Sequence, residues 1–158
     1  MKRHKMFSHM AELGVALAVV WILVQLFSAY RDFQRDAVPA TAFFQVVDFH
    51  IPDHVVGGNP VVSYDREILK PFRGFWVAEV QKRSGDGFEP VCFRPGAANY
   101  DPEDQLPDPV TLEWLLVRLC DLPPDEEYRI QLGWDIMAEG YPLKQVSFFS
   151  NWFRVLPE

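Results

Sequence analysis

One short motif has the residue types and spacing of a zinc site. His50 and His54 lie four positions apart and are interleaved with Asp48 and Asp53. Histidines at this spacing can share a metal when they lie on one face of a helix. Pro52 stands between them and disfavours a helix, and on a strand they would lie about 13 Å apart. We therefore expect these histidines to be structural or surface residues.

Carboxylates are concentrated between residues 101 and 127. Calcium takes six to eight oxygen ligands, which an acidic loop could supply, but this stretch lacks the spacing and the glycine of an EF-hand. The two other interpretations are a solvated acidic surface and a face that meets a basic partner. The side chains we expect on such a partner face are Asp101, Glu103, Asp104 and Asp108.

The two cysteines, Cys92 and Cys120, are 28 positions apart and do not form a C-x-x-C motif. We expect a disulfide, which on the loop-entropy argument would stabilise the fold by about 3–4 kcal/mol. The alternative is a pair of buried free thiols. An even cysteine pair in a small domain favours an oxidising compartment.

Motifs that would identify an enzyme are missing from the sequence. It contains no G-x-S-x-G, no glycine-rich phosphate loop and no H-E-x-x-H, so we expect neither catalysis nor a cofactor. An acid/base pair assembled only by the fold stays open. Residues 43–158 hold 10 Lys or Arg and 19 Asp or Glu, a formal charge of −9. Such a domain repels nucleic acid, which we do not expect as a partner.

Residues 13–30 form the one long apolar segment, with no charge between Glu12 and Arg31. As a helix they would span roughly 27 Å, close to the hydrocarbon thickness of a bilayer. A cleaved signal peptide is the competing interpretation. The segment is longer than the usual apolar region and no A-x-A-like site ends it. We therefore expect an uncleaved signal anchor that contacts the lipid bilayer.

The orientation of the anchor rests on weaker signals. Lys2, Arg3 and Lys5 precede it, whereas Arg31 and Arg35 follow it, a small positive-inside bias. Together with the cysteine pair, this bias predicts a cytoplasmic N-terminus and an exported C-terminal domain. The sequence has no N-x-S/T sequon. We therefore expect a single-pass protein of a bacterial inner membrane with a periplasmic domain.

These observations divide the chain into four parts. Residues 1–12 are a basic cytoplasmic tail, 13–30 the transmembrane anchor, 31–42 a linker, and 43–158 the exported domain. In the anchor, Gly14 and Ala18 form a small-x-x-x-small pair that permits close helix packing. Composition alone often produces such pairs, so the oligomeric state stays open.

The exported domain is expected to be mainly β. Residues 72–83 and 128–138 alternate like strands, and the stretch from Ser84 to Gly87 has the glycines of a hairpin turn. We expect a long loop over 95–109. Residues 111–120 fit both periodicities. We favour a strand, because the neighbouring segments are strands, over a helix with a leucine face and Asp108 as N-cap.

Leu122, Pro124 and Tyr128 have the spacing of the tyrosine corner of fibronectin type III and related immunoglobulin-like domains. Asp125 stands where those domains usually have glycine. In this corner the tyrosine hydroxyl bonds the preceding loop and fixes the turn between two sheets. The resemblance covers about residues 110–156. It implies an immunoglobulin-like β-sandwich, preceded here by one N-terminal transmembrane helix.

Three functions fit this organisation. The one we favour is a membrane-anchored periplasmic binding or assembly module that tethers or scaffolds a protein partner in the envelope or membrane. A second is a phage or prophage envelope-acting protein, for lysis or for exclusion of other phage. A third is a periplasmic enzyme, which would need a concave pocket with convergent polar groups. The overall layout also resembles short single-pass proteins of bacteria and their phages.

Overall fold

The computed structural model describes residues 2–116 and 120–158, in two compact units, Met1–Val38 and Pro39–Glu158. The first unit is a single helix, α1 (Lys2–Asp36), which extends beyond 13–30 at both ends. Its stretch Gly14–Asp36 is long and apolar enough to cross a membrane. Pro39 follows shortly after the helix, and the residue before a proline is disfavoured in helical conformation.

The second unit is mainly β, as the sequence predicts. Short helical segments, η1 (Ala40–Ala42) and α2 (Leu112–Leu116), accompany the strands. The strands, in chain order, are β1 (Phe44–His50), β2 (His54–Val55), β3 (Ser63–Ile68), β4 (Phe72–Ser84), β5 (Gly87–Tyr100), β6 (Glu127–Met137), β7 (Lys144–Phe149) and β8 (Phe153–Leu156).

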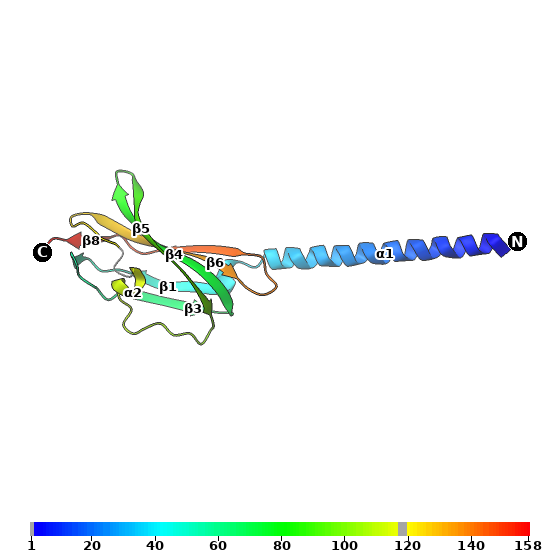
Figure 1. Cartoon of the computed structure of the whole chain (residues 1–158), viewed down its shortest axis with the longest axis horizontal. Helices are drawn as coiled ribbons and strands as arrows, with labels where there is room; N and C mark the ends of the chain where they lie inside the picture. The colour runs from blue at the N-terminus through cyan, green and yellow to red at the C-terminus, as the bar shows by residue number, and fades with distance from the viewer. Residues whose placement is uncertain (1, 117–119) are drawn as a thin grey trace. The chain divides into compact units, whose positions relative to one another are not determined.

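The strands form a small sheet and a large sheet (Figure 1). In the small sheet β1 pairs antiparallel with β3. In the large sheet the order is β2-β8-β6-β4-β5, and β7 also pairs with β6. β7 and β8 are consecutive stretches along the same side of β6. Ser150 bridges the break between them, because its N–H donates to the carbonyl of Ile130 and its Oγ accepts from the Ile130 N–H, both at 2.9 Å.

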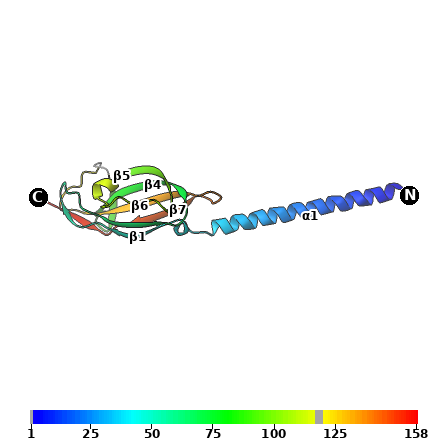
Figure 2. The same cartoon turned by 90° about the horizontal axis from the view of Figure 1, so that it is seen from below.

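The core lies between the two sheets, whose layers Figure 2 shows from a second direction. β6 alternates strictly, with buried Tyr128, Ile130, Leu132, Trp134 and Ile136. Phe44 of β1 crosses the interior to the large sheet, where its ring centroid lies 4.6 Å from that of Trp134. Aromatic residues bury large areas, and tilted pairs of this kind add to the stability that burial provides.

The expected strand over 111–120 is wrong where the structure describes it, because residues 112–116 form α2. Leu112, Leu115 and Leu116 are buried at helical spacing. The helix begins after Thr111, whose Oγ1 accepts from the N–H of Trp114 at 3.3 Å, a normal N-cap bond. The cap is therefore Thr111 and not Asp108. Residues 117–119 lie outside the described residues.

The expected loop over 95–109 also begins too early, because β5 continues to Tyr100. Pro90 and Pro95 lie within this strand, opposite Gln81 and Val77 of β4. A proline is tolerated there because β5 is the last strand of the large sheet, where one side of the strand pairs with no further strand among the described residues.

Candidate functional site

The two cysteines are joined in the structure. Cys92 of β5 and Cys120, which follows α2, form a disulfide with a Cα–Cα distance of 5.9 Å. This distance lies within the range of ordinary disulfides. The bond closes a loop that contains α2, so it holds α2 at the edge of the large sheet.

The corner residues lie together at the start of β6. The Tyr128 hydroxyl donates to the carbonyl of Pro123 at 2.9 Å, and the side chain is 0 % exposed. Burial raises the pKa of Tyr128. Asp125, where the related domains have glycine, adopts a φ of 66° and donates its N–H to the carbonyl of Val155 at 2.8 Å. Leu122 is buried and Pro124 is exposed. These contacts give the corner a structural role.

The acidic loop, residues 101–108, is exposed, but its carboxylates are partly used within the loop. Asp104 Oδ2 accepts from the N–H of Asp101 at 2.8 Å, and Asp101 Oδ1 accepts from the N–H of Glu103 at 3.3 Å. Asp108 is also exposed. Within the described residues, no group of three or more His, Cys, Asp or Glu side chains is arranged to hold a metal ion.

The remaining sequence candidates lie apart from one another. Gly14 and Ala18 are exposed on α1, and a Cβ built on Gly14 meets nothing within 4 Å. His50 is exposed on β1. The ring of His54 stacks on Phe153 at 5.5 Å, and its Nδ1 lies 3.1 Å from the carbonyl oxygen of Pro52. These contacts explain His54 as a structural residue.

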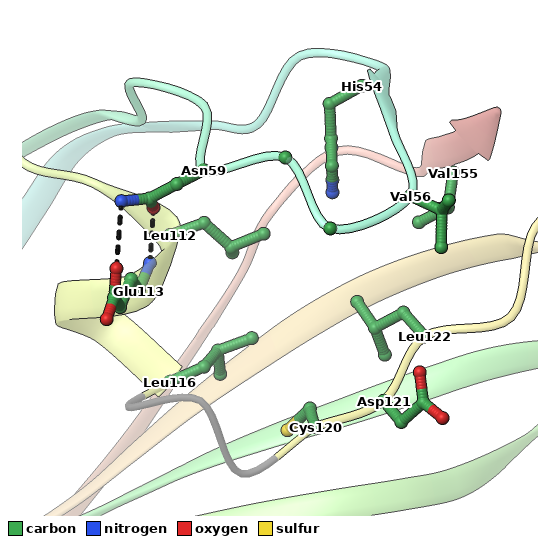
Figure 3. A pocket seen from close by; sticks show the side chains of 12 residues that line it. His54, Val56, Asn59, Leu112, Glu113, Leu116, Cys120, Asp121, Leu122 and Val155 are labelled. Atoms are coloured by element: carbon green, nitrogen blue, oxygen red, sulfur yellow. Dashed lines mark hydrogen bonds between the residues drawn. The ribbon is translucent and has the colours of Figure 1, made fainter. Parts of the chain in front are cut away.

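A cavity of about 390 Å³ lies beside the disulfide. Figure 3 shows its titratable side chains, His54, Glu113 and Asp121, on separate walls. Glu113 is hydrogen-bonded to the side chain of Asn59, which donates to Glu113 Oε2 at 3.3 Å and accepts from the Glu113 N–H at 2.8 Å. This pair holds α2 to the preceding loop. The three side chains do not converge as a nucleophile and base or as metal ligands would.

One sheet face mixes exposed hydrophobic side chains with polar ones such as Glu79, Gln131 and Asp135, and it was not predicted from the sequence. We call it the outer face: the side of the large sheet that points away from the core. Its large hydrophobic side chains are exposed, and Phe93 is 67 % exposed. They are Phe75, Val77, Phe88, Phe93, Met137 and Phe149.

The outer face has a hollow at its centre. Gly133 pairs with Val77 on one side and Ser147 on the other, and its lack of a side chain leaves a depression of about 270 Å³. Phe75 and Asp135 also line this depression. A surface that combines exposed aromatic rings with a shallow hollow can receive an apolar side chain from another protein.

One end of the outer face carries an arginine among aromatic rings. The Arg129 guanidinium carbon lies 4.7 Å from the ring centroids of Phe88 and Phe149 and 4.8 Å from that of Trp152. Its Nε donates to Gln81 Oε1 at 2.8 Å. Cation–π contacts of this kind favour this arrangement of the rings.

Comparison with protein families, with curated proteins and with solved structures finds no match for this chain. The candidate function therefore rests on the geometry described above.

Proposed function

We propose that this protein is a membrane-anchored binding or assembly module that holds a protein partner in the bacterial envelope. The outer face carries this proposal. It groups several exposed aromatic rings on one side of a sheet, a surface that another protein can cover. An exposed aromatic ring such as Phe75 beside a hollow is also typical of the centre of protein interfaces.

The proposed location follows from two features of the chain, the apolar helix and the disulfide. α1 contains a span suited to a bilayer, and the disulfide fits a compartment outside the cytoplasm. The basic residues before the span favour a cytoplasmic N-terminus. We therefore assign the anchor to the inner membrane and the β domain to the periplasm.

We also propose that the β domain is an immunoglobulin-like sandwich related to fibronectin type III domains. The strand order in the large sheet, with β1 and β3 opposite, supports this assignment. The Tyr128 corner supports it from an independent position in the chain. Such a scaffold serves many functions, so the outer face and not the fold carries the functional argument.

Site-specific photo-crosslinking in intact cells tests the proposal. A photoreactive phenylalanine replaces Phe93 on the outer face, and in the matched control it replaces Val47, which is exposed on β1 of the small sheet. We expect a discrete protein adduct from position 93 and none from position 47. Phe75→Gln should weaken the adduct, because it removes an aromatic ring next to the hollow.

Equal labelling from positions 93 and 47 would contradict the proposal, as would adducts with lipid alone at position 93. A protein adduct of twice the chain's mass would instead identify the partner as a second copy of this protein.

A further inference from the structure

A second cavity, of about 350 Å³, lies on the opposite side of the large sheet from the outer face. It is lined by Arg66 of β3 and by residues of β5, the edge strand of the large sheet. α2 and the acidic loop also contribute to its wall. Three of the chain's five tryptophans line it: Trp76, Trp114 and Trp134. Its size and aromatic lining are typical of small-ligand sites.

Arg66 brings a guanidinium group to this cavity, and this group is hydrogen-bonded to the side chain of Tyr64. Its Nε is buried and has no hydrogen-bond acceptor among the described residues. Its guanidinium carbon lies 5.2 Å from the ring centroid of Tyr100, so the group is held against an aromatic wall. Burial raises the pKa of the neighbouring Tyr64, which keeps that hydroxyl protonated.

Arg94 adds a second cation, in a fixed position. Its Nη1 donates to the carbonyls of Trp114 at 2.5 Å and Leu115 at 3.0 Å, and its guanidinium carbon lies 5.1 Å from the Trp76 ring centroid. Arg94 therefore ties α2 to the large sheet while keeping its charge at the cavity. Among the described residues that line the cavity, only Asp104 is acidic, and its Oδ2 accepts from the Asp101 N–H.

We propose that this cavity binds a carboxylate attached to a planar or apolar group. A guanidinium matches a carboxylate in shape and charge, and both Arg66 and Arg94 line the cavity. The planar part of the ligand would lie against the tryptophan and tyrosine rings. The carboxylate could belong to a free organic acid or to the C-terminus of a peptide. This site is separate from the outer face and goes beyond the proposed function.

Tryptophan fluorescence of the full chain in detergent provides the test, since three tryptophans line the cavity. The first probe pair is phenylacetate and its neutral amide. The second is a short peptide ending in phenylalanine, with a free or an amidated C-terminus. We expect saturable binding of the acids at least about tenfold tighter than the amides, as a charge-assisted bond requires. Which acid binds more tightly identifies the source.

Arg66→Gln should abolish the preference for acids over amides. The matched control is Arg73→Gln on β4, an exposed arginine that contacts Phe75 and does not line the cavity. Arg66→Lys keeps the charge but loses the planar fork, so we expect several-fold weaker acid binding. This variant decides the question if Arg66→Gln does not fold.

The proposal is overturned if neither acid gives a saturable change up to about 10 mM, if acids and amides bind equally, or if Arg66→Gln and Arg73→Gln have equal effects. These outcomes are independent of the crosslinking at Phe93. Failure of one proposal therefore leaves the other standing.

Discussion

At the scale of single residues, the Tyr128 hydroxyl offers a clean measure of the corner. Tyr128→Phe removes its bond to Pro123 and keeps the buried ring, so the free energy of unfolding should fall by about 1 kcal/mol. Urea denaturation of the purified protein measures the change. The control is Tyr141→Phe, whose ring packs on Phe43, and we expect almost no effect there. An unchanged denaturation midpoint for Tyr128→Phe would show that this hydrogen bond does not stabilise the fold.

The lowered pKa of Glu127 makes the stability of the fold depend on pH. Hydrogen bonds from Arg154 and then Arg83 hold its pKa below the ordinary value of 4.5. A carboxyl group whose pKa is lowered on folding stabilises the folded state at pH values above its pKa in the unfolded chain. This stabilisation is lost as the pH falls through its pKa in the folded protein. Between about pH 5 and pH 3, the melting temperature of Glu127→Gln should therefore fall less than that of the unmodified chain. Glu67→Gln, at an exposed position on β3, should behave like the unmodified chain.

The corner was predictable because its residues are close in sequence and their spacing is specific. The role of Asp125 follows from the same motif, because glycine's usual place there implies a positive φ, which the structure shows at 66°. Ser150 was not predictable. Its bonds to Ile130 exist only because β7 and β8 meet β6 at that point, 20 positions away in the chain.

At the scale of elements, α2 is a segment whose hydrophobic periodicity does not decide between a strand and a helix. Its leucines satisfy both a strand and a helix pattern, so the sequence could not decide between them. The deciding contact comes from Asn59, which is 54 positions away and accepts from the N–H of Glu113. A helix of five residues has little stability of its own, so these capping bonds and the burial of its leucines determine its conformation.

Replacing glycine with alanine should have different effects at two positions of the large sheet, Gly96 and Gly133. A Cβ on Gly96 would overlap the Trp76 indole, so Gly96→Ala should destabilise the fold by about 1–3 kcal/mol. A Cβ on Gly133 meets only Ser147 Oγ, at 3.6 Å. Gly133→Ala should therefore be neutral or slightly stabilising. Thermal unfolding of both variants checks this, and similar losses for both would contradict the packing described around Trp76.

At the scale of the whole molecule, the fold class and the apolar helix were predictable, because each depends on long and regular patterns. The outer face was not. Both alternating series on β4 are largely apolar, Phe75 and Val77 against Trp76 and Ala78. Only contact with β1 on the other side of the sheet shows which series is buried. The cavity at Arg66 depends on pairing between strands that are distant in the chain, so it was not predictable from the sequence either.

One mass measurement tests anchoring and oxidation together. We expect the protein from the membrane fraction to retain residues 1–30, because no good cleavage site ends the apolar segment. Without a reducing agent its mass should be lower by two hydrogen atoms than after reduction, because Cys92 and Cys120 are joined. A mature N-terminus near Tyr30 would contradict anchoring. Two free thiols in the untreated protein would contradict export to an oxidising compartment.

The prolines of β5 have a consequence for aggregation. A sheet edge can recruit strands from other molecules, and neighbouring copies in a membrane would meet often. Pro90 and Pro95 lack the N–H groups that an added strand would need along this edge. If α1 anchors several copies in one bilayer, these prolines would hinder them from joining their sheets through β5 into extended fibrils. Replacing both prolines with threonine should lower the concentration at which the protein forms aggregates that bind amyloid dyes.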